Sequence, residues 1–125
     1  MVRPENLLEF IETNTFVEDW DVLGLSDDDL SALQITIMQG GKHAPVIPAT
    51  GGLRKLRFAP PSWNVGESGA IRVGFAHFVR HGIVLLTVAY GKNEKSNLSP
   101  TEKQGIKQYL ERFRASLDQQ RGIGG

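Results

Sequence analysis

The sequence predicts a single α/β domain of the α+β type, in which a small antiparallel sheet has its helices packed on one face. Two observations predict it. Apolar residues recur at helical spacing in residues 15–37, whereas residues 53–90 alternate in the way that strands do. A second helical pattern then closes the chain. The 125 residues are enough for one compact core but not for two domains, so we treat residues 1–125 as one unit of order β-α-α-β-β-β-α.

The first half of the chain predicts one strand and two helices. Residues 7–11 form a short apolar stretch that suits an edge strand. The sequence Thr15-Phe-Val-Glu18 has the form of a capping box and predicts that a helix begins there. Ser26-Asp-Asp-Asp29 predicts the start of a second helix, because acidic residues in a first turn complement the helix dipole.

The second half predicts three strands and a long helix. Residues 53–58, 70–78 and 83–90 have strand patterns, and the last of these is apolar on both faces, as in a central strand. Ser99 is the expected N-cap of the final helix, with Pro100 in its first turn and Glu102 closing a capping box.

Composition excludes several classes of site. The chain has no cysteine, which rules out disulfides and thiolate metal ligands. None of the three histidines, His43, His77 and His81, has the spacing of a metal site, so we expect no metal and no cofactor. The longest apolar run, residues 82–90, is far short of the roughly 20 residues that a membrane span needs. With no signal-peptide pattern at residue 1, the expected location is the cytoplasm.

Charge is divided unevenly along a chain whose net charge is zero. Residues 1–50 hold two basic and nine acidic groups, a net of −7, whereas residues 51–95 hold seven basic and two acidic groups, a net of +5. Such asymmetry predicts a basic working face and an acidic back. A simpler interpretation, in which the charges only maintain solubility, stays open.

Strand alternation assigns the basic residues to one side of the predicted sheet. Leu56 and Phe58 suit the core, so Lys55 and Arg57 point the other way. In the next strand Arg72 shares a face with two small residues, glycine and alanine, which would leave room for the backbone of a ligand. If the strands are neighbours, the cations expected on one open surface are Lys55, Arg57, Arg72, Lys92 and Lys95.

This arrangement suits phosphodiester chemistry on RNA. The ribose 2′-hydroxyl can act as the nucleophile, so the protein needs only to orient the strand, stabilise charge on the phosphorus and manage two protons. Arginine is a bidentate phosphate clamp, and a lysine can act as acid or base. A basic strand is also common as plain surface or as a binding patch. Trp63, in a loop, is the best aromatic candidate for stacking on a base.

Three segments together resemble one protein family. They are Thr50-Gly-Gly-Leu-Arg-Lys-Leu-Arg-Phe58, Ser68-Gly-Ala-Ile-Arg-Val73 and Ala89-Tyr-Gly-Lys-Asn-Glu-Lys-Ser-Asn-Leu-Ser99. Their order and spacing resemble the RelE/HigB toxins of type II toxin–antitoxin systems, in particular the HigB-like RelE branch of the RelE/ParE superfamily. The resemblance covers about residues 8–117 and implies the RelE-like fold.

The resemblance implies a ribosome-dependent mRNA endonuclease, that is, an mRNA interferase that inhibits translation. It also implies a cognate antitoxin as partner, mRNA and rRNA contacts on the ribosome, and operator DNA bound only indirectly through the antitoxin. Arg72 and Arg57 would stabilise the phosphate, and Lys55 or Lys92 would transfer protons. The residues that would contact RNA or the ribosome are Arg54, Lys95, Arg80 and Trp63.

The chain departs from the family at three places. Ser99 stands where RelE has a tyrosine, and Asn93 where it has an arginine. The connection 59–69, often rich in lysine and glycine in this branch, has no basic residue here, which should weaken attraction to the ribosome. Two other functions therefore stay open: a ParE-like toxin that poisons DNA gyrase, and an inactive relative that serves as an antitoxin-binding module.

Overall fold

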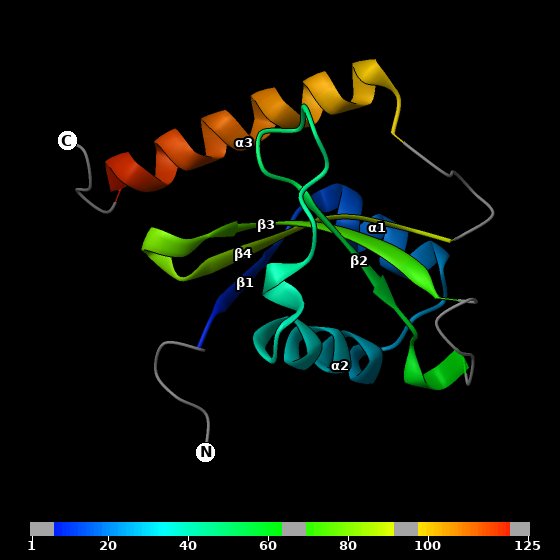
Figure 1. Ribbon diagram of the computed structural model, residues 1–125. Coiled ribbons are helices and arrows are strands. Elements are labelled where there is room, and N and C mark those ends of the chain that lie inside the picture. The colour runs from blue at the N-terminus through cyan, green and yellow to red at the C-terminus, as the bar shows by residue number, and fades with distance from the viewer. Residues whose placement is uncertain (1–6, 64–69, 92–97, 121–125) are drawn as a thin grey trace.

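The computed structural model describes residues 7–63, 70–91 and 98–120. Within them the predicted order β-α-α-β-β-β-α is confirmed (Figure 1). The elements are β1 (Glu9–Glu12), α1 (Asn14–Val22), α2 (Asp27–Met38), β2 (Arg54–Phe58), β3 (Ile71–Phe78), β4 (Ile83–Tyr90) and α3 (Pro100–Gln120), with short 3₁₀ turns at 41–43, 61–63 and 79–81.

The described strands form one sheet of order β1-β4-β3-β2. The β3–β4 and β2–β3 pairs are antiparallel, as predicted. The prediction of a wholly antiparallel sheet is wrong for β1, which runs parallel to β4 and makes the sheet mixed. Its neighbour along the sheet is the last strand in the sequence, and the two helices between β1 and β2 carry the chain across to the far edge.

Helices cover both faces of the sheet, so the prediction that they pack on one face is wrong (Figure 1). Phe16 of α1 and Leu33 of α2 pack with Phe75 and Leu86 on one face. On the other face the apolar stripe of α3 packs over the hairpin end of β3 and β4. The members of this second cluster are Leu53, Ala76, Phe78, Ile83, Leu85, Leu98, Leu110 and Leu117, with Ile106 and Phe113 beside them.

The α3 helix is fixed at both ends. The predicted capping box is confirmed, because Ser99 N donates to Glu102 Oε1 (2.9 Å) and Glu102 N donates to Ser99 Oγ (3.1 Å). Near its C-terminal end, Asp118 Oδ1 lies 2.8 Å from Nε2 of His81, whose side chain is buried in the β3–β4 turn. In the described part of the chain, no helix is both long and apolar enough to cross a membrane.

The first helix begins two residues earlier than predicted. Its N-cap is Thr13, whose Oγ1 accepts from Phe16 N (3.0 Å), and not Thr15. The same hydroxyl donates to the Thr87 carbonyl of β4 (2.8 Å), and Asp19 accepts from Ala89 N (2.9 Å). Side chains of α1 thus take over the hydrogen bonds of β4 where β1 ends. This tertiary role explains why Thr13 is the cap.

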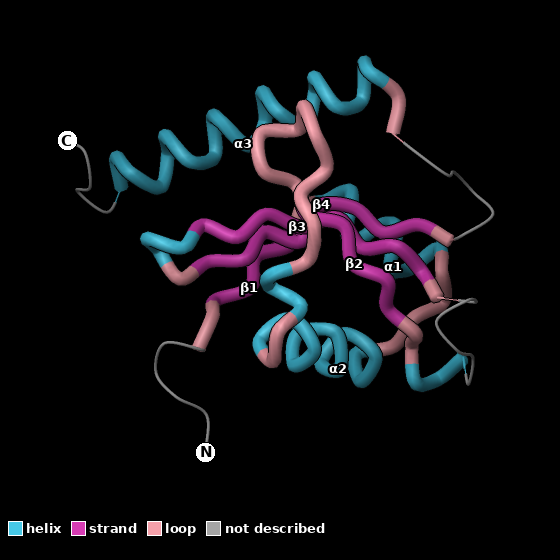
Figure 2. The backbone as a smooth tube through the Cα atoms, viewed as in Figure 1, coloured by secondary structure: helices cyan, strands magenta, loops and turns pink. Residues whose placement is uncertain are grey.

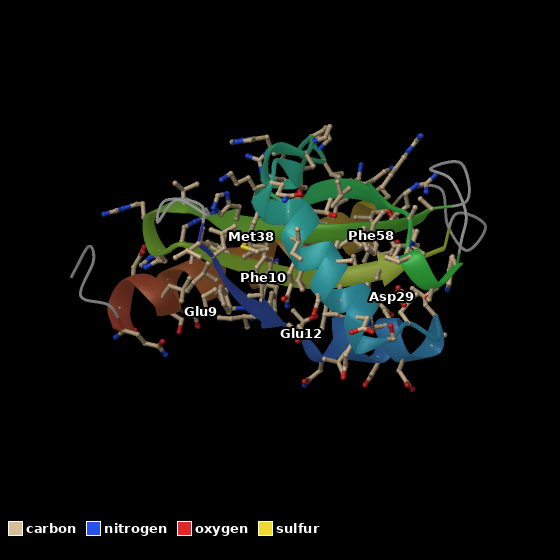
Figure 3. All side chains as sticks on the ribbon, turned by 90° about the horizontal axis from the view of Figure 1, so that it is seen from below. Glu9, Phe10, Glu12, Asp29, Met38 and Phe58 are labelled. Carbon is tan, nitrogen blue, oxygen red and sulfur yellow. The ribbon has the colours of Figure 1, made fainter. Side chains whose placement is uncertain are left out.

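Asp29 joins α2 to the 3₁₀ turn at 61–63. It completes the capping box of Ser26 and accepts two further hydrogen bonds from Ser62, one from the hydroxyl (2.6 Å) and one from the amide (3.1 Å). Figure 3 shows Asp29 at the end of α2 that lies beside this turn. Burial alone would raise the pKa of the carboxyl, but the hydrogen bonds from Ser62 and Ser26 outweigh it and hold the pKa at about 2, against 3.8 ordinarily.

We predict that Asp29→Ala lowers the free energy of unfolding by about 2 kcal/mol, because it removes a cap and leaves the Ser62 amide without its acceptor. Asp28→Ala, at an exposed position in the same helical turn, is the matched control and should change it by less than about 1 kcal/mol. Urea unfolding at pH 7 measures both. Equal losses in the two variants would contradict the role of Asp29.

The lowered pKa sets a pH dependence. The stabilisation from Asp29 is complete above its ordinary pKa of 3.8 and is lost as the pH falls through about 2. Thermal unfolding between pH 5 and pH 2 should therefore bring the wild-type protein and Asp29→Asn together at the acidic end. A stability difference that stays constant over this range would show that the carboxylate charge is not what Asp29 contributes.

Candidate nucleic-acid interface

Cross-strand pairing brings three predicted cations to one face of the sheet. Arg57 lies directly opposite Arg72 in the β2–β3 register, and Lys55 lies opposite Gly74 two positions along. On the next strand Arg72 lies opposite Tyr90. The core residues Leu56 and Phe58 point to the α1–α2 face, so these cations share the opposite face. They were predicted to share a face, but that face is partly covered by α3 and not free of helices. They lie toward the end of the sheet opposite the β3–β4 turn.

A groove of about 740 Å³ opens beside these cations. Residues 40–41 and 43–48, which follow α2, form one wall, and residues 55–57 of β2 form another. The lining is completed by Tyr90 at the end of β4, by Leu98, and by Lys103 in the first turn of α3. Figure 2 shows the loop between α2 and β2 crossing the edge of the sheet toward α3. The lining residues place the groove at this crossing.

The groove is electropositive. Among the described residues that line it, three are cations (Lys55, Arg57 and Lys103), one is histidine (His43), and none is acidic. Burial and then the nearby charges of Arg54, Lys42 and His43 lower the pKa of His77 on β3. Figure 3 shows nitrogen-tipped side chains along this edge and oxygen-tipped ones along α1 and the start of α2. Basic side chains thus gather along the β2 edge and acidic ones along α1 and the start of α2.

The two paired arginines beside the groove differ in exposure and in hydrogen bonding. Arg57 is exposed, whereas Arg72 is half-buried and its Nη1 donates to the Ala70 carbonyl (2.7 Å). In the part of the chain that the structure describes, neither of them, nor Lys55, forms an ion pair with an acid. Like charges directly opposite each other in a sheet repel. The pair is therefore suited to share an anion.

The other predicted contact residues lie elsewhere. Arg54 is half-buried, and its Nη1 donates to the Ala44 carbonyl (2.6 Å), beneath the loop. Arg80 lies in the β3–β4 turn, at the far end of β3 from Arg72. Trp63 packs against the core on the α1–α2 face. The structure does not bring these three into the groove. Lys92 and Lys95 lie outside the described residues.

The space predicted above the small residues of β3 is filled, so that prediction is wrong. A Cβ at Gly74 would lie 2.8 Å from Val88 Cγ2 and 3.2 Å from Leu53 Cδ2. Ala76 is buried in the cluster under α3. The small side chains accommodate the protein's own core and leave no room for a ligand. The open space lies further toward the β2 edge.

Two groove residues were missed by sequence reasoning. Lys103 is one helical turn after Ser99, so its place in the first turn of α3 was readable, but the packing of α3 over the sheet was not. His43 belongs to a 3₁₀ turn that no sequence pattern indicated. Both could have been found only by knowing that the loop and α3 meet across the sheet.

No protein-family model matches the chain. Within the described residues, no group of three or more His, Cys, Asp or Glu side chains could hold a metal ion. What the site offers is positive charge from Lys55, Arg57 and Lys103, and apolar residues in the same lining. These features suit binding of a phosphodiester chain.

We predict that Arg57→Gln raises the free energy of unfolding of the free protein by about 0.5 kcal/mol, because it relieves the repulsion from Arg72. Arg112→Gln, an exposed change on α3, is the matched control and should have no such effect. Added sulfate should reduce the difference in unfolding free energy between Arg57→Gln and the wild-type protein, because it binds between the paired arginines of the wild type. A loss of stability in Arg57→Gln at low salt would contradict the repulsion.

Proposed function

We propose that the chain is a toxin of the RelE/HigB kind, a ribosome-dependent endoribonuclease that cuts mRNA and inhibits translation. The observation that supports this best is the direct pairing of Arg57 with Arg72, with Lys55 beside them, on a face without an acidic partner among the described residues. The resemblance in three segments and the order β-α-α-β-β-β-α agree with this proposal. The RelE-like fold is part of it.

The proposed reaction is an internal transfer on the RNA chain. The 2′-oxygen attacks phosphorus and the P–O5′ bond breaks, which leaves a 2′,3′-cyclic phosphate and a 5′-hydroxyl. One group must accept the 2′-hydroxyl proton, and another must give a proton to O5′. Arg57 and Arg72 would stabilise the charge that develops on the phosphorus oxygens, and Lys55 would carry one proton. Lys92 is the other candidate for proton transfer.

Ser99 is the N-cap of α3, which affects which group could transfer the second proton. Its hydroxyl accepts from the Glu102 amide, and in this proposal it serves as the cap of α3 and not in place of the tyrosine that the family carries there. Lys103, one turn further along α3, lines the groove and places a cation on the same side. We include Lys103 among the residues that would hold the phosphate chain.

The proposed partners follow from the same reading. A cognate antitoxin would cover or block the basic groove, and operator DNA would be bound only through it. The ribosome would supply most of the binding surface for mRNA, since this small groove alone holds few phosphates. The proposed place of action is the cytoplasm.

We predict that Arg72→Ala abolishes growth arrest when the chain is induced without its neighbouring gene, because the phosphate loses its second clamp. The free energy of unfolding should change by no more than about 1 kcal/mol, which is the contribution of one hydrogen bond. Arg112→Ala, which removes an exposed cation of α3, is the control and should arrest growth normally. An Arg72→Ala variant that remains fully toxic would remove the central assignment.

Mapping of mRNA 5′ ends in the same cells separates the possible functions. New ends inside translated codons support the ribosome-dependent nuclease. Arrest with intact mRNA would contradict it and favour the gyrase poison. No arrest from folded protein would also contradict it and favour the antitoxin-binding module.

A further inference from the structure

A second groove, with a mostly apolar lining, runs along one flank of α3, between that helix and the start of α1. It consists of two adjoining hollows of about 490 and 180 Å³. Both hollows are lined by Thr15, Val88, Gly105 and Ile106. Val88 is the one residue of β4 that is not buried. Glu102 lines this groove and Lys103 lines the basic groove, so the two grooves lie on different flanks of α3.

Gly105 lies inside α3, where a glycine destabilises the helix. Apart from proline, glycine is the least favourable residue in a helix interior. A Cβ added at Gly105 would meet no other part of the described protein within 4 Å, so the protein's own packing does not require a glycine there. Gly105 is exposed and lines both hollows of the groove. Close approach of another molecule to the helix at this point would explain why a side chain is absent.

The exposed stripe of α3 that includes Gly105 has the spacing of a helix that pairs with another helix. Its members recur at alternating intervals of three and four residues, which is the repeat of a coiled-coil contact. They are Glu102, Gly105, Tyr109, Arg112 and Ser116, all of them exposed. Figure 1 shows α3 along the outer side of the molecule. Tyr109 is 41% exposed, so the stripe presents a protruding aromatic ring one helical turn from the gap at Gly105.

The stripe is complementary to itself when a second copy of α3 runs antiparallel beside it. If the centre of the pair is level with Lys107, Tyr109 of each copy faces Gly105 of the other, because both lie two positions from the centre. Glu102 of each copy then faces Arg112 of the other, five positions from the centre, so opposite charges meet twice. Lys107 itself lies against the loop between α2 and β2, away from the stripe, so the two lysines do not meet. A parallel pair would instead place Glu102 against Glu102 and Arg112 against Arg112.

We propose that two copies of this chain form a symmetric dimer through the stripe, in which Tyr109 of each copy occupies the groove beside Gly105 of the other. The ring would then be removed from water against Val88 and Ile106. Thr15, in the same lining, offers a hydroxyl to the phenol group. The inference is independent of the proposed nuclease, and pairing leaves the basic groove accessible because that groove lies on a different flank of α3.

Analytical ultracentrifugation of the whole chain, from about 1 to 500 µM, measures the Kd of dimerisation, and we expect a monomer–dimer equilibrium within this range. Gly105→Gln should raise the Kd at least about tenfold, because the new side chain fills the place of the ring. The change improves helix propensity, so the variant should remain folded. Ala115→Gln, a similar enlargement at an exposed position of α3 outside the stripe, is the matched control and should leave the Kd unchanged. A wild-type chain that stays monomeric, or equal effects of the two substitutions, would overturn the proposal.

Two charge changes test the antiparallel register. Arg112→Glu alone places two acids opposite each other, and Glu102→Lys alone places two bases opposite each other, so at low salt each should raise the Kd about fivefold. An equimolar mixture of the two variants restores both opposite-charge pairs in the mixed dimer and should recover a Kd close to that of the wild-type protein. Circular dichroism checks that both are folded, because Glu102 also closes the capping box of α3. A mixture that associates no better than either variant alone would contradict the pairing.

In this proposal Arg112 acts only between copies. Unfolding at protein concentrations well below the Kd concerns the monomer, so Arg112→Gln stays neutral there. The proposed nuclease uses the groove of a single copy, so Arg112→Ala stays a control for growth arrest. A dimer without growth arrest would keep this inference and refute the nuclease, and growth arrest by a chain that stays monomeric would do the reverse.

Discussion

The antiparallel pairing of β3 with β4 is the interaction on which the rest of the structure depends. Both strands are buried on both faces: Phe75 and Leu86 point to one side, and Phe78 and Leu85 to the other. Such a hairpin cannot be stable in water with helices on one face alone. It therefore requires α1 and α2 beneath and α3 above. The buried residues of α3 pack over the hairpin end, and the groove lies toward the opposite end of that face, with Lys103 of the first turn of α3 in its lining.

The same arrangement lets a chain of zero net charge present a basic surface. Six of the fourteen acidic residues lie in the first two helices, where Asp29 and its neighbours begin α2 and Asp19 accepts from an amide of β4. On the α1–α2 side Asp29 and Asp19 serve as hydrogen-bond acceptors for backbone amides. Lys55 and Arg57 of β2 and Arg72 of β3 point to the α3 side, and no acid is among the described residues that line the groove. A polyanion would thus meet local charge of one sign.

The loop between α2 and β2 is part of the core as well as a connection. It crosses the edge of the sheet, is bonded to β2 at two points, and reaches α3, where Gly51 approaches Lys107 closely. Gly51 has a positive φ of 73°, which a side chain would strain, and an added Cβ would lie 3.2 Å from Lys107 Cγ. The loop ties the edge strand to the helix above it. Its rigidity gives the groove a defined second wall.

The sequence by itself determined the order of elements, the central hairpin, the caps at Ser26 and Ser99, and the face on which Lys55, Arg57 and Arg72 lie. These depend on local spacing and on strand alternation, which are properties of neighbouring residues. Four features came only from the tertiary structure. They are the parallel placement of β1, the second helical layer, the choice of Thr13 over Thr15 as cap, and the presence of His43 and Lys103 in the lining of one groove. Each of them depends on contacts between segments far apart in the chain, such as the bond from Thr13 to Thr87, and local pattern carries no information about those contacts.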